Sequence, residues 1–388
     1  MNATIKLYDL DAYQTSFQGT VLSCLPVDDS RFDLILDQTL FFPEEGGQTP
    51  DKGTIQSIPV LDVQIKDQII HHYIEQQIPE GTLVAGEINW AERFSNMQQH
   101  SGEHIFSGFV NAAFGYHNVG FHLSQNEVTM DYDGPLTWDD IYELEAKSNQ
   151  SIYRNLTITA AYPSKEELSK LEYRSKIEIN GAVRIVTIPG VDVCACCAPH
   201  VHRTGEIGVI KITQLQNYKG GVRLHLLCGK RAMADYRKKQ ELVLAVSNRL
   251  STSTDTISDA VDKLLGDIQT YKNQIVALQR ESIASKAAAI PENTTNCILF
   301  EASLDAIPHR ELVNLLTAKC SGICGVFVGN DTDGYRYIVG SANIDVREIN
   351  TTLRTAFNGR GGGSKEMVQG SLTGTAKDLK SLFDGLHV

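Results

Sequence analysis

Hydrophobic and polar positions alternate with a period of two near the start of the chain. Short apolar runs at residues 32–36, 60–65 and 69–74 are separated by segments rich in turn-forming residues. Alternation over four to eight residues between turn signals is typical of half-buried β-strands. We therefore expect a small antiparallel β-barrel over residues 1–90.

After Asn89 the spacing of the apolar residues changes to that of a helix. Asn89 is a suitable N-cap residue, and Glu92 follows it as in a capping box. Apolar residues then recur at helical spacing from Phe94 to Phe109, which predicts a helix with one buried face. Later segments predict strands at 121–123 and 127–132, a helix from 137 or 139 to about 155, and a strand at 183–188. Residues 91–230 are thus expected to form an α+β domain.

Residues 231–290 are rich in Lys, Gln, Leu and Ala and contain no proline. The polar stretch 251–255 interrupts this helical run, so it can form a helical hairpin or a single rod. After the interruption, apolar residues alternate at spacings of four and three, which predicts the buried seam of a coiled coil. The seam residues are Ile257, Val261, Leu264, Ile268, Tyr271, Ile275 and Leu278.

A further change of pattern follows residues 291–295, and residues 291–388 are expected to form a small α/β domain. Its predicted strands are 297–300, 325–328 and 335–339, and its predicted helices lie near 309–319 and 345–357. The last segment, 358–365, is a glycine-rich loop that contains Arg360 and Lys365. Unobstructed backbone amides beside basic residues can bind phosphates or a polynucleotide backbone, although a plain structural turn explains the glycines as well.

Composition narrows the classes of protein that fit this pattern. The 388 residues are 42% hydrophobic, which suits two or three domains, and no segment has the apolar length of a membrane span. The net charge of −12 argues against indiscriminate nucleic-acid binding but permits a local basic surface. Eight cysteines without the spacing of a disulfide scaffold indicate reduced thiols, so we expect a cytoplasmic protein with no membrane partner.

Two short motifs carry the most specific chemistry. His100 and His104 are four residues apart on the predicted helix, so both imidazoles lie on one face. Cys196 and His200 form a C-x-x-x-H motif after the predicted strand 183–188. A set of three imidazoles and one thiolate suits Zn²⁺, which prefers nitrogen and sulfur ligands. Either motif taken alone has a plainer interpretation. The two histidines can lie on the polar face of the helix, and the cysteines can fill a hydrophobic core.

The order of motifs resembles one family, the alanyl-tRNA editing proteins of the AlaX type in their long form. These proteins are similar to the editing and C-terminal parts of alanyl-tRNA synthetase. The matching segments are residues 37–48, 100–104, 196–200, 204–208, 219–223 and 359–363. The chain departs from the synthetase pattern at residues 197–199, where Cys-Ala-Pro replaces the usual Gly-Gly-Thr. This change leaves the expected ligand positions intact and affects only the local loop.

The resemblance implies a hydrolase that deacylates Ser-tRNA(Ala) and Gly-tRNA(Ala) in trans, since no aminoacylation module precedes Met1. The residues it assigns to zinc are His100, His104, Cys196 and His200. It places Thr39 and Gln48, in a loop with paired glycines, near the aminoacyl group. It also implies that the editing domain is residues 91–230, and that residues 231–388 add tRNA binding or dimerisation, with a homodimer expected.

Two other functions remain compatible with the sequence. One is a deacylase for another mischarged tRNA such as Ser-tRNA(Thr), because threonyl-tRNA editing domains have similar metal motifs. The other is a zinc-stabilised RNA-binding or dimerisation protein without catalysis. Whether the zinc activates a water molecule or anchors the substrate is also left open. Glu103 follows Gly102 rather than the first histidine and points about 100° around the helix from His104, so we expect a structural role for it.

Overall fold

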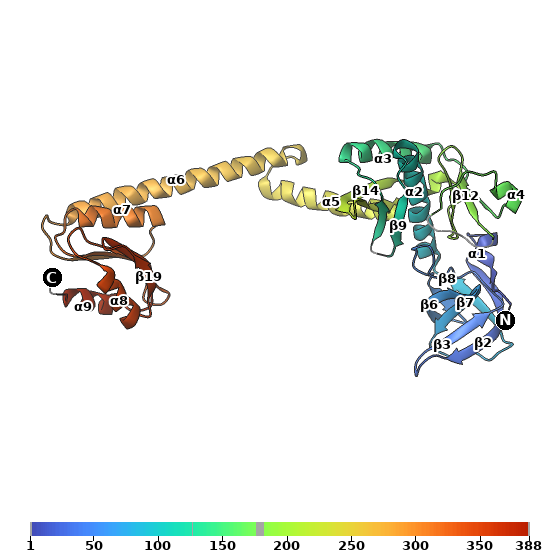
Figure 1. The fold of residues 1–388 in the computed structure, drawn as a ribbon, viewed down its shortest axis with the longest axis horizontal. Helices are drawn as coiled ribbons and strands as arrows, with labels where there is room; N and C mark the ends of the chain where they lie inside the picture. Colours follow the sequence, from blue (N-terminus) through green and yellow to red (C-terminus); the bar gives the residue numbers. More distant parts are fainter. Residues whose placement is uncertain (1, 126, 176–181, 387–388) are drawn as a thin grey trace. The chain divides into compact units, whose positions relative to one another are not determined.

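The computed structural model describes residues 2–125, 127–175 and 182–386 as a mixed α+β chain, which confirms the predicted class (Figure 1). The chain divides into two compact units, Met1–Val243 and Leu244–Val388. Within the described residues, no helix combines the length and apolar character needed to cross a bilayer. The finer division into four domains stays a prediction.

Six strands of the first unit form a closed barrel in the order β2-β3-β7-β6-β5-β8. Alternate side chains of β7 and β8 are buried, as the period of two predicts, and the interior is filled by residues such as Leu34, Phe42 and Ile70. The strand bounds are β2 Ser16–Pro26, β3 Phe32–Leu36, β5 Gly53–Ile55, β6 Ile58–Lys66, β7 Ile69–Ile74 and β8 Leu83–Ile88. Before the barrel, β1 (Ile5–Lys6) leads into the short helix α1 (Leu7–Leu10) and pairs in parallel with β4 (Gln38–Thr39).

Helix α2 (Trp90–Phe114) follows the barrel and carries the first histidine pair. The side chain of Asn89 accepts a hydrogen bond from the backbone N–H of Glu92, so the predicted N-cap is confirmed. The capping box is wrong in its second half, because the Glu92 carboxylate accepts from Gln125 and lies 3.4 Å from the Lys52 ammonium. Helix α2 ends at Phe114, and the C-cap residue Gly115 has a left-handed φ of 72°.

A buried ion pair fastens α2 to the barrel. The Arg93 guanidinium bonds both carboxylate oxygens of Asp51 and the carbonyl oxygen of Leu40, and Asp51 also accepts from the backbone N–H of Phe42. Both charged side chains are at most 2% exposed. Several hydrogen bonds therefore meet each buried charge, so neither charge is left uncompensated. The ion pair sets the position of the helix that presents His100 and His104.

Two small sheets and helix α3 (Trp138–Tyr153) complete the first unit, and α3 agrees with the helix predicted from 137 or 139. One sheet has the order β14-β15-β10-β9 and the other β11-β12-β13. Their strands are β9 Asn118–Leu123, β10 Val128–Tyr132, β11 Thr159–Ala161, β12 Ile185–Ile188, β13 Asp192–Ala195, β14 Ile210–Tyr218 and β15 Gly221–Cys228; the short helices are α4 Lys165–Leu168 and η1 Thr204–Ile207. Helix α2 packs against β15 so closely that a Cβ on Gly102 would lie 2.3 Å from the Cys228 sulfur.

The second unit contains a five-stranded sheet between two pairs of helices. The sheet has the order β16-β17-β18-β20-β19, and alternate residues of its strands face α6 and α7 on one side and α8 and α9 on the other. The helices are α6 Ile257–Ala289, α7 Ala306–Thr317, α8 Arg347–Ala356 and α9 Ala376–Asp384; the strands are β16 Cys297–Glu301, β17 Cys324–Asn330, β18 Gly334–Gly340, β19 Arg360–Gly363 and β20 Met367–Leu372. Helix α5 (Gly229–Leu250) spans the division between the units, and η2 (Thr254–Thr256) separates it from α6, where the sequence predicts an interruption.

The predicted coiled-coil seam lies on α6. From Val261 to Leu278 its side chains are 38% to 65% exposed, whereas Ile283 and Ala287 near the end of the helix are buried against α7. The seam therefore has an apolar surface that α7 does not cover.

The glycine-rich segment differs from the loop that the sequence predicts. Residues 360–363 form β19, an edge strand antiparallel to β20, and of the segment 358–365 only Asn358 has a positive φ. A Cβ on Gly361 or Gly363 would lie 2.4 or 2.2 Å from a carbonyl oxygen of β20. Close strand pairing thus explains these glycines, and the predicted phosphate-binding loop is wrong in its backbone conformation.

Candidate metal centre

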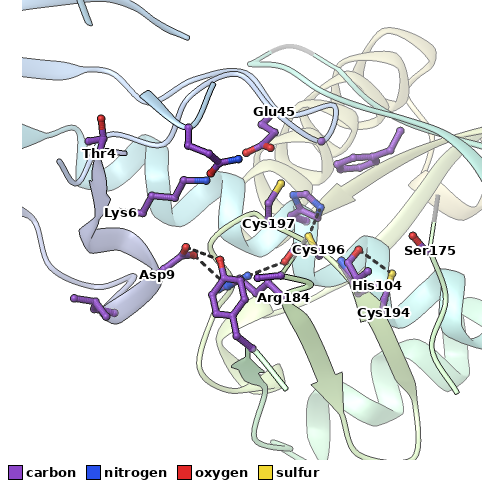
Figure 2. Close-up of a pocket in the computed structure, with 18 of the residues that line it drawn as sticks. Thr4, Lys6, Asp9, Glu45, His104, Ser175, Arg184, Cys194, Cys196 and Cys197 are labelled. Carbon is purple, nitrogen blue, oxygen red and sulfur yellow. Dashed lines mark hydrogen bonds and ion pairs between the residues drawn. The ribbon is translucent and has the colours of Figure 1, made fainter. Parts of the chain in front are cut away.

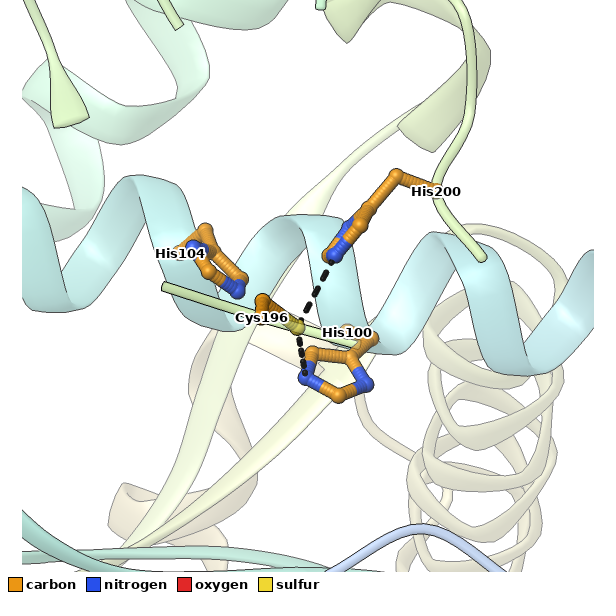
Figure 3. A group of neighbouring side chains, drawn as sticks. All are labelled: His100, His104, Cys196 and His200. Carbon is orange, nitrogen blue, oxygen red and sulfur yellow. Dashed lines mark hydrogen bonds between the residues drawn. The ribbon is translucent and has the colours of Figure 1, made fainter. Parts of the chain in front are cut away.

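The structure brings together the four side chains that the two motifs predict as ligands (Figure 3). His100 and His104 project from α2, and Cys196 and His200 come from the loop after β13. Their ligand atoms all lie within 4.8 Å of one another. The Cys196 sulfur is 3.5 Å from Nε2 of His100 and 3.3 Å from Nε2 of His200. Three nitrogens and one sulfur at this spacing could hold one metal ion.

Each imidazole of the cluster is held through its other nitrogen. Nδ1 of His100 lies 2.9 Å from Oε1 of Gln48, and Nδ1 of His104 lies 2.9 Å from Oδ2 of Asp192. Amide and carboxylate oxygens only accept, so both Nδ1 atoms carry the proton. Nδ1 of His200 lies 3.0 Å from Oγ of Ser101. These contacts leave the three Nε2 atoms for a metal, as is usual for metal-binding histidines.

The contact partners of His104 and His200 could not be read from the motifs. Ser101 lies between two predicted ligands, but a serine on a helix has many other roles. Asp192 stands four residues before Cys196 and carries no recognisable pattern. In the sequence, His104 and Asp192 are 88 positions apart, and Ser101 and His200 are 99 positions apart.

Arg174 fixes Asp192 in turn, with Nε and Nη2 donating to the two carboxylate oxygens at 2.8 and 2.9 Å. Burial raises the pKa of Asp192, but hydrogen bonds from His104 and Arg174 outweigh it and hold the pKa below its ordinary value. A second group of ligand atoms, from His104, Asp192 and Cys194, also lies within 4.8 Å. Because Arg174 already neutralises Asp192, a second cation is disfavoured there.

The two neighbouring thiols differ in their protonation. Burial raises the pKa of Cys196, but His100 and His200 beside it outweigh this and lower the pKa well below its ordinary value. The pKa of Cys197 is raised by burial, by the adjacent Cys196 and by Glu45. Only a thiolate binds a metal well, so the chemistry favours Cys196 as the sulfur ligand.

A cavity of about 980 Å³ opens beside the cluster, within the first unit (Figure 2). His100, His104 and Cys196 are among the residues that line it. Its wall also includes a mixture of charged, aromatic and sulfur-containing side chains: Lys6, Asp9, Glu45, Tyr162, Arg184, Cys194 and Cys197. The size is sufficient for a ligand larger than an amino acid.

Thr39, in β4, is fully buried and is not among the residues that line the cavity, and its hydroxyl has two partners. Nδ1 of His72 is 3.1 Å from the Leu34 carbonyl oxygen, so Nδ1 carries the proton and Nε2 accepts from the Thr39 hydroxyl at 2.9 Å. Burial lowers the pKa of His72 to about 4, which keeps this ring neutral. The Thr39 oxygen also accepts from the backbone N–H of Phe41. These two bonds leave one lone pair of the Thr39 hydroxyl oxygen that could accept a further hydrogen bond.

The other residues singled out in the sequence lie in different parts of the structure. Gln48 is fully buried, contacts the predicted ligand His100 and is not among the residues that line the cavity. Arg360 and Lys365 belong to the second unit, where both are exposed. Glu103 is buried, and its carboxylate accepts from Ser107 and Asn118, which joins α2 to β9.

Comparisons with known proteins agree with the motif order. A family model described as the threonyl and alanyl tRNA synthetase second additional domain matches residues 183–225. The chain is 26% identical over 389 residues to the alanyl-tRNA editing protein Aarsd1 of Danio rerio, covering 95% of this chain and 93% of that protein. It is 25% identical over 392 residues to the alanyl-tRNA editing protein AlaX-L of Pyrococcus horikoshii, covering 96% of each.

The resemblance also extends to a larger enzyme. An alanine–tRNA ligase of Pyrobaculum neutrophilum is 27% identical over 398 residues, which cover 97% of this chain but 44% of the ligase. The resemblance that the motifs predict is therefore confirmed: over nearly its whole length, this chain is similar to the long-form alanyl-tRNA editing proteins.

Proposed function

We propose that this protein is a cytoplasmic, zinc-dependent hydrolase that removes serine or glycine from mischarged tRNA(Ala) in trans. The observation that carries the proposal is the cluster of His100, His104, Cys196 and His200, which borders a cavity of about 980 Å³. The similarity to proteins named alanyl-tRNA editing proteins supports the substrate class.

The donor set fits zinc better than a hard cation. Zinc prefers imidazole nitrogen and thiolate in tetrahedral geometry, whereas Mg²⁺ and Ca²⁺ prefer oxygen ligands. The Nδ1 contacts of the three histidines support the same choice, because they leave each Nε2 as the metal-binding atom. When bound, zinc supplies a Lewis acid that polarises an ester carbonyl or a water molecule.

Gln48 has atoms suited to both the metal centre and the substrate. Its Oε1 accepts from His100, while its buried Nε2 has no hydrogen-bond partner among the described residues. We propose that Gln48 serves the metal centre through His100, which lines the cavity, and that it lies near the bound aminoacyl group. The ester carbonyl oxygen of that group gains negative charge when water attacks. The ester C–O bond then breaks, and the ribose oxygen takes up a proton.

Purified protein should hydrolyse Ser-tRNA(Ala) and Gly-tRNA(Ala), spare Ala-tRNA(Ala), and lose this activity when a chelator removes the metal. The measurement is the release of labelled amino acid from each tRNA, before and after chelation and again after zinc is restored. Ser-tRNA(Thr) serves as the comparison substrate. Preferential hydrolysis of Ser-tRNA(Thr) would favour the other deacylase function, and tRNA binding without hydrolysis would favour a non-catalytic RNA-binding protein.

We further propose that the α6 seam joins two copies of the chain. Its apolar side chains are spaced as in a coiled coil and exposed in the single chain. A charge at Leu264 should convert the dimer into a monomer, because it would be buried against a second apolar helix. Sedimentation of Leu264→Asp against Asn273→Asp, a change on the polar side of α6, tests this. A wild-type monomer, or a dimer that Leu264→Asp leaves intact, would exclude the seam as the interface.

Arg360 and Lys365 remain proposed contacts to the RNA backbone. Both are exposed, and the β19 strand places Arg360 on the sheet edge. Loss of two phosphate contacts reduces the salt dependence of binding by about two units of slope. Binding of tRNA by the Arg360→Gln, Lys365→Gln variant across a salt titration measures that slope, and an unchanged slope would remove both residues from the interface.

A further inference from the structure

Arg184, the residue before β12, holds the backbone of Cys196 from two sides. Its own carbonyl oxygen accepts from the Cys196 N–H at 3.0 Å, and its Nη1 donates to the Cys196 carbonyl oxygen at 3.0 Å. The same Nη1 donates to the carbonyl oxygen of Ala198 at 2.9 Å. One residue therefore engages both backbone polar groups of the cysteine that supplies the sulfur ligand.

The guanidinium is itself held from another part of the chain. Its Nε lies 3.1 Å from Oδ1 of Asp9 in α1, and Oδ2 of Asp9 accepts from the Tyr162 hydroxyl at 2.9 Å. The side chain of Arg184 is only 7% exposed. All three residues line the cavity beside the metal cluster (Figure 2). Arg184 thus connects α1 with the loop that carries Cys196.

The loop needs such an anchor because residues 196–200 belong to neither a helix nor a strand. The position of the sulfur depends on the backbone dihedrals at Cys196, and freely rotating dihedrals would move it away from the Nε2 atoms of His100 and His200. A planar guanidinium can bond two carbonyl oxygens and a carboxylate at once, which a lysine ammonium cannot do with the same geometry.

We infer that Arg184 is a positioning residue that fixes Cys196 in the orientation required for metal binding. The inference rests on the proposed metal centre. Nothing in the C-x-x-x-H motif points to Arg184, which precedes Cys196 by 12 positions. The side chain acts through the loop backbone.

Arg184→Lys in the full chain should bind zinc about 10–100-fold more weakly than the wild type, the usual cost of losing a partner that orients a ligand. Zinc affinity is measured by competition with a chromophoric chelator. In the cobalt-substituted protein, the thiolate-to-metal absorption band should weaken or shift, because it reports the Cys196 sulfur directly. Asp9→Asn, which removes only the charge that holds the guanidinium, should give a smaller change in the same direction.

Arg223→Lys is the matched control, since Arg223 also forms a two-bond ion pair, with Asp131, but does not bond the ligand loop. Zinc affinity and a cobalt spectrum that stay at wild-type values in Arg184→Lys would overturn the inference, even if its melting temperature fell. If Arg184→Lys does not fold, the same two measurements on Asp9→Asn decide. Wild-type protein that binds no zinc would instead overturn the proposed metal centre.

Discussion

Replacement of Cys196 by alanine should remove the metal and the ester hydrolysis together. The expected fall in hydrolysis of Ser-tRNA(Ala) exceeds about 100-fold, since loss of even an outer partner of a metal ligand costs about 10–100-fold. The physical reason is that Cys196 supplies the cluster's only sulfur, as a thiolate favoured by His100 and His200. Metal analysis of the purified variant and single-turnover deacylation measure the two effects.

Cys197→Ala is the matched control for this change. The neighbouring thiol has a raised pKa and lies outside the group of four ligands, so its loss should leave the metal content unchanged. Stoichiometric metal and full activity in Cys196→Ala would remove Cys196 from the site. Cys194 and Cys197 would then need the same test.

Replacement of Thr39 by valine should impair discrimination between serine and alanine esters. Exclusion by size cannot spare alanine, because alanine is the smaller amino acid. A polar partner for the serine hydroxyl can discriminate more strongly than an apolar pocket, by up to about 10⁴-fold or more. The Thr39 hydroxyl gives its proton to His72 and one lone pair to Phe41, so it has one acceptor lone pair left for a serine hydroxyl. A serine side chain must reach this buried position, outside the lining of the cavity, to use it. Alanine has no hydroxyl to donate.

We therefore expect Thr39→Val to lower hydrolysis of Ser-tRNA(Ala), or to raise hydrolysis of Ala-tRNA(Ala), with unchanged zinc content and a much smaller effect on Gly-tRNA(Ala). The rates on the three esters measure this. The variant also leaves His72 and the Phe41 N–H without their partner, which costs about 1–3 kcal/mol of stability. Thr39→Ser keeps the hydroxyl and is the control. Equal losses on serine and glycine esters would indicate general positioning, and no change on any ester would exclude Thr39 from the pocket.

Local patterns were sufficient for the elements that carry the chemistry. The N-cap at Asn89 and the helical period after it predict α2, and a spacing of four residues places His100 and His104 on one face. These features depend on residues close together in the chain, where the period of a helix or strand decides which side chains share a face. For the same reason the alternating runs predict β3 and β7, and the heptad spacing predicts α6.

The glycine-rich segment shows where a local pattern fails. Residues 358–365 have the composition of a loop, yet four of them pair with β20 as an edge strand. Composition alone could not reveal a neighbouring strand whose carbonyl oxygens leave no room for a Cβ.

By itself, the sequence determined the α+β class, the helix with its histidine pair, the cysteine motif and the similarity to long-form editing proteins. Only the tertiary structure decided which groups hold the ligands: Gln48 on His100 across 52 positions, Asp192 on His104 across 88, and Ser101 on His200 across 99. The physical reason is that each contact joins separate elements. Their approach depends on how the barrel, α2 and the sheets pack, and no local period encodes that packing.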